Sequence, residues 1–558
     1  MKFPQMTYKR VELEPALEKM QVLLDKFKGA KTAEEAFAAF KEVDDFNGYC
    51  DTMFSLGFIR HTLDTKDEFY DAEKDYIDET TPKLMPLKQE FTKALLASPF
   101  RKEFEAKWGT LMFDKAEMEL KTFKPEIVPD LQEENKLVSE YDKLVASAEI
   151  EFDGKTLTLA QLGPYHEDPD RTVREASLRA RADWFMQHAE KLDSIFDELV
   201  KVRTRMAKKL GYKSFTELGY YRMERLCYGG KEVDNFRQAV LSYIVPVVGR
   251  FKSEQAKRIG VETIRPYDDA CLYLDGNAKP VGTPDDIFAH SKKMYHELSK
   301  DTAAFIDFML EKELFDVLTR PGKASGGYCS YLQDYKSPFI FANFNGTSGD
   351  IDVLTHEAGH AFAAYEGRDI YPTALADYSA DIAEIHSMAM EFFAWPWMEG
   401  FFGDATKKYL ESHLASALTF LPYGSMVDDF QHRIYENPEM TPAQRNALWL
   451  EMEGKYRPYL DLKDFPFYGE GRRWQAQLHI FGYPFYYIDY CLAQTAALAF
   501  WAEDQENHQA AWDKYCRLVR LAGTKTFSDL LTDSQLASPF VPATLKNIAD
   551  SVTKWLEK

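Results

Sequence analysis

The order of apolar and polar residues along the chain predicts a largely helical protein. Apolar residues recur at helical spacing in Ala16–Phe27, in Lys83–Leu96 and from Asp170 to Leu210, as in amphipathic helices. Around Ile150–Leu162, β-friendly residues flank an Asp-Gly pair, which predicts a small hairpin at the junction of two lobes. No repeat or long Pro/Gly/Ser linker appears, so we expect lobes that pack closely.

One segment, Gly326–Phe344, departs from helical spacing. Its two β-rich runs, Tyr328–Leu332 and Phe339–Phe344, flank the turn-forming Asp334–Pro338, and this pattern predicts a two-stranded ribbon. The outer edge of such a ribbon can pair with the backbone of an extended peptide, or the ribbon can simply brace the next helix. The residues expected to contact a peptide are Gly326, Gly327, Tyr328, Phe341 and Ala342.

Length, charge and cysteine content narrow the class of protein. A chain of 558 residues is longer than one compact core usually requires, so two or three lobes are expected. The formal charge of −22 makes nucleic acids and anionic membranes poor partners. No secretory signal or membrane-spanning run is evident, and the six scattered cysteines lack a C-x-x-C pair. We therefore expect a cytoplasmic protein with reduced thiols.

The strongest chemical motif is T-H-E-A-G-H at Thr355–His360. Thr347 and Asp350 resemble a helix-capping box before it, and Gly367 stands where a helix would stop. Apolar residues between these signals are spaced so that they can pack inward. The motif is therefore predicted to lie on a helix of about five turns.

On that helix, His356 and His360 lie one turn apart and face the same way. Two imidazoles so placed can occupy two corners of a zinc tetrahedron, while Glu357 can reach a water on the metal without binding the metal itself. Gly359 costs a helix about 1 kcal/mol relative to alanine, which a purely structural helix has little reason to carry. The alternative is that the motif occurs by chance.

A third ligand is expected from a carboxylate, because zinc sites with an open position often combine two histidines with one carboxylate. Glu384 and Glu391 lie on one face of a helical stretch downstream of the motif. From spacing alone, three other residues compete with Glu384 for this role: Asp377, Asp381 and His386.

The segment Phe344–Phe362, the ribbon before it and the run A-E-I-H-S-M-A-M-E after it resemble the thimet oligopeptidase and oligoendopeptidase F family, and most of all its bacterial oligoendopeptidases. The resemblance extends from about Asp170 to the C-terminal region. It implies a mainly α, elongated, two-lobed zinc metallopeptidase with a deep substrate channel and a small β-ribbon beside the zinc helix. We expect an N-terminal helical lobe over residues 1–160 and a catalytic domain over residues 161–558.

The same resemblance assigns roles to single residues. Glu384, Ser387 and Glu391 match the family's E-x-x-S-x-x-x-E run, which makes Glu384 the third zinc ligand. Glu391 then either orients a zinc-binding histidine or belongs to a buried polar network. Glu357 is expected to accept the proton of the attacking water.

A tyrosine-rich segment, His479–Tyr490, is expected to supply hydrogen-bond donors for the oxyanion. Tyr483, Tyr487 and Tyr490 would share one helix face if Pro484 lay near the helix start. By resemblance, Tyr483 and Tyr490 match the family's spacing well and Tyr487 less well, whereas His479 lies one place off. The alternative is a tyrosine stripe that belongs to the core.

The predicted function is hydrolysis of internal bonds in unstructured oligopeptides by a monomer or small homo-oligomer holding one Zn²⁺ per chain. One alternative is a dipeptidyl carboxypeptidase of the same zinc family. Others are a non-catalytic, zinc-stabilised peptide-binding protein and a helical metal-dependent phosphohydrolase, which would usually need His-Asp pairs. Mn²⁺ or Co²⁺ can replace zinc in an N/O ligand set.

Overall fold

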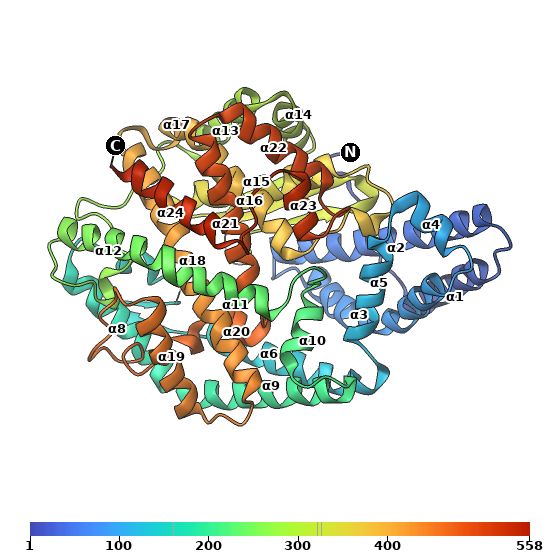
Figure 1. The fold of residues 1–558 in the computed structure, drawn as a ribbon, viewed down its shortest axis with the longest axis horizontal. Helices are drawn as coiled ribbons and strands as arrows, with labels where there is room; N and C mark the ends of the chain where they lie inside the picture. Colours follow the sequence, from blue (N-terminus) through green and yellow to red (C-terminus); the bar gives the residue numbers. More distant parts are fainter. Residues whose placement is uncertain (160, 321, 325, 558) are drawn as a thin grey trace. The chain divides into compact units, whose positions relative to one another are not determined.

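The computed structural model describes residues 1–159, 161–320, 322–324 and 326–557, and helices dominate it (Figure 1). The predicted mainly α fold is confirmed. The chain packs into two compact units, each assembled from three segments. The first unit comprises Met1–Leu120, Lys279–Thr406 and Glu503–Leu536, and the second comprises Lys121–Ala278, Lys407–Ala502 and Ala537–Lys558. The expected domain division at residue 160 follows chain order and stays a prediction.

The first unit contains most of the N-terminal helices and the predicted metal helix. Its helices are α1 (Leu13–Lys28), α2 (Ala33–Leu63), α3 (Glu68–Leu96), α4 (Arg101–Trp108), α5 (Leu111–Thr122), α13 (Pro284–Leu298), α14 (Lys300–Glu311), α15 (Gly349–Glu366), α16 (Ala380–Phe393), α17 (Met398–Phe402), α22 (His508–Leu521) and α23 (Phe527–Asp533). The helices predicted at Ala16–Phe27 and Lys83–Leu96 are confirmed as parts of α1 and α3.

A three-stranded sheet in the first unit precedes α15. Its strands are β3 (Phe315–Leu318), β4 (Tyr328–Leu332) and β5 (Ser337–Phe344), in the order β3-β5-β4. The predicted ribbon is confirmed as the antiparallel pair of β4 and β5. The prediction missed β3, which pairs parallel to β5. A short parallel strand is hard to identify locally because its partner lies far along the chain.

Packing of aromatic side chains fixes α15 and α16 within the first unit. Phe305 on α14, Phe362 on α15 and Trp512 on α22 are buried, with ring centroids 5.6 Å apart for Phe305–Phe362 and 6.1 Å for Phe362–Trp512. Phe393 on α16 lies 5.2 Å from the ring of Tyr515 on α22. Large aromatic rings packed at these distances hold the helices firmly.

The second unit is also helical. Its elements are α6 (Val128–Ala146), β1 (Ile150–Phe152), β2 (Lys155–Leu157), α7 (Gly163–His166), α8 (Arg171–Gln187), α9 (Ala189–Leu210), α10 (Phe215–Arg222), α11 (Gly230–Ala239), α12 (Val245–Ile259), α18 (Thr406–Glu436), α19 (Pro442–Tyr456), α20 (Leu478–Gly482), α21 (Tyr487–Asp504) and α24 (Pro542–Leu556). The hairpin predicted around Ile150–Leu162 is confirmed as β1 and β2, but it lies inside this unit and not at its boundary. Ala160, within that predicted segment, lies outside the described residues. The helical segment from Asp170 to Leu210 is confirmed as α8 and α9.

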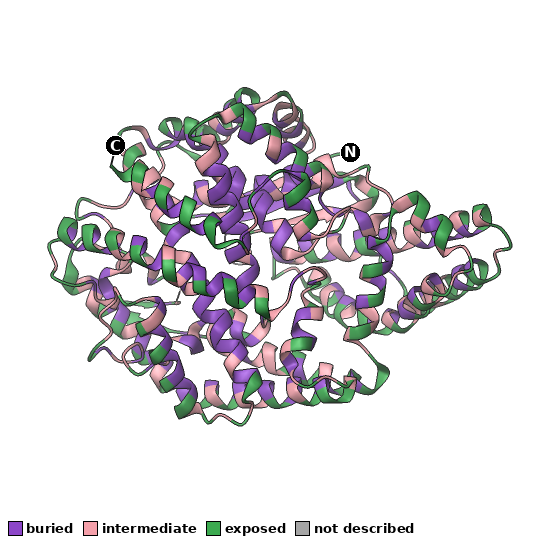
Figure 2. Ribbon diagram, in the orientation of Figure 1, coloured by how far each residue is buried: buried purple, intermediate pink, exposed green. Residues whose placement is uncertain are grey.

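The core of the second unit combines aromatic rings with buried ion pairs. Trp474 stacks on Phe481 at 5.9 Å, and both rings are inaccessible to solvent. Arg203 donates to Glu134 at 2.7 Å, with both side chains almost fully buried. Figure 2 shows buried residues along one face of many helices and exposed residues along the other. Among the described residues, no helix is both long and apolar enough to cross a bilayer.

Candidate metal and catalytic site

Helix α15 presents both histidines of the motif on one face. The rings of His356 and His360 lie with their centroids 5.0 Å apart, and their side chains are 24% and 19% exposed. A ligand can therefore reach them. The predicted helix is confirmed, and Gly367 caps its C-terminal end.

The predicted capping box does not form at the start of α15. The N-cap residue is Ser348, and its side chain makes no capping hydrogen bond. The carboxylate of Asp350 instead accepts hydrogen bonds from the backbone N–H groups of Asn345, at 2.8 Å, and Gly346, at 2.7 Å. Asp350 thus ties the loop after β5 to the helix, because its side chain turns back toward the preceding residues.

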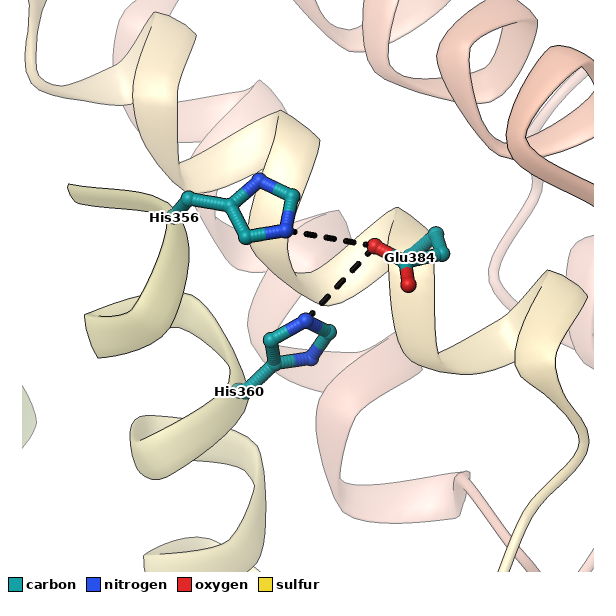
Figure 3. A group of neighbouring side chains, drawn as sticks. All are labelled: His356, His360 and Glu384. Carbon is teal, nitrogen blue, oxygen red and sulfur yellow. Dashed lines mark ion pairs between the residues drawn. The ribbon is translucent and has the colours of Figure 1, made fainter. Parts of the chain in front are cut away.

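Glu384 on α16 completes a group of three ligand atoms (Figure 3). Its Oε2 lies 3.3 Å from His356 Nε2 and 3.6 Å from His360 Nε2. Two corners of a zinc tetrahedron with bonds of roughly 2.0–2.1 Å are about 3.3–3.4 Å apart, so these separations fit such an ion closely. The three donor atoms all lie within 4.8 Å of one another. The donor set, two imidazoles and a carboxylate, is one that zinc accepts.

The three competing residues lie outside this group, which is the sole one of its kind that the described residues form. His386 points elsewhere into the core: its side chain is fully buried, and burial lowers the pKa of its imidazole to about 3. Asp377 and Asp381 accept hydrogen bonds from backbone N–H groups of their own segment, at 3.0 and 2.9 Å.

Opposite charges stabilise the ionised forms of these side chains. Burial alone lowers the pKa of His356, but hydrogen bonds and charges from Glu384 and Glu391 outweigh it and raise that pKa well above its usual value. Burial opposes ionisation of Glu384 as well, yet the nearby His360 and His356 hold the pKa of this carboxyl well below its usual range. Glu384 is therefore an anion, as a metal ligand must be.

Glu391, for which the sequence left two roles open, contacts a histidine of the motif directly. Its Oε1 lies 2.7 Å from His356 Nδ1. In the neutral imidazole that metal binding requires, donation of this hydrogen bond by Nδ1 leaves Nε2 without a proton, facing Glu384 and the position a metal would take. The arrangement matches that of carboxylates that orient metal-binding histidines.

Glu357 lies beside the two histidines but is more deeply buried. It is 7% exposed, and its Oε2 has no hydrogen-bond partner among the described residues. Burial raises the pKa of Glu357, while the nearby His356 and His360 oppose that rise. A carboxylate with a raised pKa accepts a proton more readily than an exposed one does.

The end of the sheet lies next to Glu357. A Cβ built on Gly327 would lie 3.2 Å from Val353 Cγ1 and 3.7 Å from Glu357 Oε1. Gly327 therefore leaves space open beside the carboxylate. Gly326 before it has φ 92°, a conformation that favours glycine.

The expected peptide-pairing residues divide into two groups. Phe341 and Ala342 lie on the central strand β5, where Phe341 already pairs with Asp316 of β3 and Tyr328 of β4. Both side chains are buried and β5 has a strand on each side, so Phe341 and Ala342 do not form the outer edge at which a peptide was expected to pair. The outer edge of β4, which starts at Tyr328, has no paired strand among the described elements, and the same holds for the outer edge of β3.

The tyrosine-rich segment lies in the second unit and is not one helix face as predicted. Tyr487 opens α21 and Tyr490 lies within its first turn, but Tyr483 falls before the helix, just after α20. Phe485, with φ 68°, separates the two helices because this left-handed conformation interrupts helical geometry. The ring of His479 lies 4.8 Å from that of Tyr487 and 6.0 Å from that of Tyr490. Tyr483 is 57% exposed.

One contact in the first unit was not assigned from the sequence. The Ser387 hydroxyl lies 3.0 Å from Glu384 Oε2 and 3.0 Å from the Glu384 carbonyl oxygen. The sequence did contain a signal for this contact, because a serine three residues after a glutamate lies on the same helix face. Spacing alone does not show that the two side chains bond to each other.

Comparison with known families gives two matches along the chain. The model of Peptidase family M3 matches residues 286–550, and that of the Peptidase M3 N-terminal domain matches residues 3–123. The oligoendopeptidase F homolog of Lactococcus lactis subsp. lactis (strain IL1403) is 24% identical over 348 residues. That alignment covers 61% of this chain and 56% of the relative, so the chain matches little more than half of the relative's length.

Solved structures match over nearly the whole chain. A structure of PZ peptidase A with an inhibitor is 47% identical, with a TM-score of 0.95, covering 100% of this chain and 99% of that one. Oligoendopeptidase-F from Enterococcus faecium has a TM-score of 0.63 at 13% identity and covers 98% of each chain, which shows a shared fold.

Proposed function

Because this chain belongs to peptidase family M3, a family of metallopeptidases, we propose that it is a zinc endopeptidase that cleaves internal bonds of short peptides. One observation carries the proposal: Glu384 Oε2 lies 3.3 and 3.6 Å from the two Nε2 atoms of His356 and His360, the separations of a zinc tetrahedron. One ion per chain would be held by these three residues.

The other residues take roles that follow from their positions. Zinc, when bound, supplies a Lewis acid that activates water and polarises the peptide carbonyl. Glu357 accepts the proton of the attacking water and passes it to the leaving amine. Burial raises the pKa of Glu357 and so favours the protonated carboxyl that exists between these two steps. Glu391 holds the proton of His356 on Nδ1.

We assign the hydrogen-bond donors to the oxyanion to the tyrosine-rich segment. Tyr483 and Tyr490 are the preferred donors, and Tyr487 and His479 are the secondary candidates. Burial raises the pKa of Tyr487, so its hydroxyl stays protonated and able to donate. The peptide would lie along β4, near the space that Gly327 leaves beside Glu357. Unstructured oligopeptides are the proposed substrates, and the cytoplasm is the proposed location of a protein whose six cysteines are all free.

The proposal is tested with an internally quenched peptide whose C-terminus is amidated, so that no terminal carboxylate is available. Wild type, Glu357→Gln and the control Glu399→Gln, an exposed glutamate of α17, are compared at equal measured zinc content. We expect internal cleavage by wild type and control, and a kcat lower by about 10²–10⁴ in Glu357→Gln, the usual contribution of a general base.

The other outcomes separate the alternatives. Cleavage only of peptides with a free C-terminus, always releasing dipeptides, would replace the endopeptidase with a dipeptidyl carboxypeptidase. Zinc-loaded wild type that binds peptides and cleaves none would favour a binding protein.

A further inference from the structure

Helices α15 and α16 approach each other most closely at Gly359. A Cβ built on Gly359 would lie 2.5 Å from the His386 carbonyl oxygen and 2.6 Å from Ser387 Cα. Both are backbone atoms, so no side-chain rotation can make room. Gly359 lies within the helix and does not adopt a left-handed conformation, so the requirement for glycine is space and not backbone freedom.

The α16 backbone at this contact is also held by a hydrogen bond from α22. The Tyr515 hydroxyl on α22 donates a hydrogen bond to the His386 carbonyl oxygen at 2.8 Å. His386, Ser387 and Tyr515 are all fully buried. Because α16 is bonded to α22 and packed against α15 at this point, it has little freedom to move away from a larger residue at position 359.

The same turn of α16 positions the expected third ligand. Ser387 Cα faces Gly359, while its Oγ lies 3.0 Å from Glu384 Oε2, the oxygen nearest the two histidines. The separation between the two helices and the direction of the Glu384 carboxylate are therefore set at one place.

We propose that Gly359 and Ser387 are positioning residues for the metal: Gly359 fixes the distance between the two ligand-bearing helices, and Ser387 fixes the Glu384 carboxylate. This inference rests on the zinc site of the proposed function. An alanine Cβ at ordinary contact distance, 3.4 Å or more, requires α15 and α16 to separate by about 0.8–0.9 Å at this point. Metal–ligand distances tolerate about 0.2 Å, so such a shift pulls Glu384 out of bonding range.

The test measures zinc affinity, independent of peptide cleavage, by competition with a chromogenic chelator. The variants are Gly359→Ala, Ser387→Ala and the control Gly367→Ala. The control makes the same substitution at the end of α15, where φ is −82° and the nearest atom to an added Cβ is 3.3 Å away. The melting temperature of each metal-free variant shows whether the fold is retained.

We expect the zinc dissociation constant to rise at least about tenfold in Gly359→Ala and about three- to tenfold in Ser387→Ala, within the range for residues that orient metal ligands. Gly367→Ala should stay within twofold of wild type. A folded Gly359→Ala that binds zinc as tightly as wild type overturns the inference. If Gly359→Ala does not fold, an unchanged affinity in Ser387→Ala overturns it. Wild type that binds no zinc contradicts the proposed function itself, which separates the two failures.

Discussion

The contact between Glu391 and His356 allows a quantitative prediction. Glu391 Oε1 lies 2.7 Å from His356 Nδ1, and the two side chains are 15% and 24% exposed. A hydrogen bond to a charged group contributes about 1.5–3 kcal/mol when solvent is largely excluded. If that contribution is present only when His356 is oriented for zinc, Glu391→Ala weakens zinc binding by about 10- to 150-fold. Glu391→Gln keeps an acceptor but loses the charge, so its loss should be smaller, roughly fivefold.

The assay is the zinc dissociation constant of the purified protein, measured by chelator competition at one pH for wild type, Glu391→Ala and Glu391→Gln. Glu399→Ala, at an exposed position on α17, is the control. The expected order of affinity is wild type and control, then glutamine, then alanine. If Glu391→Ala binds zinc within twofold of wild type while its fold is intact, Glu391 belongs to a polar network that does not orient the ligand.

Three further predictions concern the substrate side, the ion pair and the metal. Gly327→Val places methyl groups beside the Glu357 carboxylate, and we expect kcat/KM to fall at least about tenfold with zinc content unchanged; unchanged kinetics would contradict the peptide position. Burial opposes ionisation of Glu134, but Arg203 and Arg222 together outweigh it and lower the pKa to about 2, below the ordinary 4.5. The stabilisation from the ionised Glu134 is therefore present above about pH 4.5 and lost as pH falls toward 2. Glu134→Gln should lower the free energy of unfolding by about 3 kcal/mol at pH 7, seen as a lower melting temperature, and by less at pH 4. Removing zinc with a chelator should abolish cleavage and lower the melting temperature, and added zinc should restore both; a chelator-resistant activity would contradict a metal mechanism.

The metal helix and the helix carrying Glu384 could be predicted because their information is local. His356 and His360 share a face through helical periodicity alone, and Glu384 with Glu391 follows the same rule. Which carboxylate meets the histidines is a tertiary question. Spacing left four candidates open, the family resemblance selected Glu384, and the structure places Glu384 beside both imidazoles.

Two predictions about helix boundaries were wrong, because a contact with the preceding loop decided the first and a left-handed backbone residue decided the second. Asp350 caps the preceding loop and not the helix start, because its partners are the N–H groups of Asn345 and Gly346. The helix through the tyrosines is interrupted at Phe485, a non-glycine residue with positive φ that no composition rule marks.

Contacts between segments far apart in the sequence also limited what could be predicted. Strand β3 joins β5 across an intervening segment, so periodicity within either strand does not reveal it. The close backbone contact at Gly359 was visible in the sequence only as a glycine that a helix would not favour.

The most direct test of the central claim is anomalous diffraction from crystals of the zinc-loaded protein, recorded on both sides of the zinc absorption edge. The account predicts one zinc peak per chain, with bonds of about 2.0–2.2 Å to His356 Nε2, His360 Nε2 and a Glu384 oxygen. A zinc peak held by other residues, or zinc bound to the two histidines without Glu384, would contradict it.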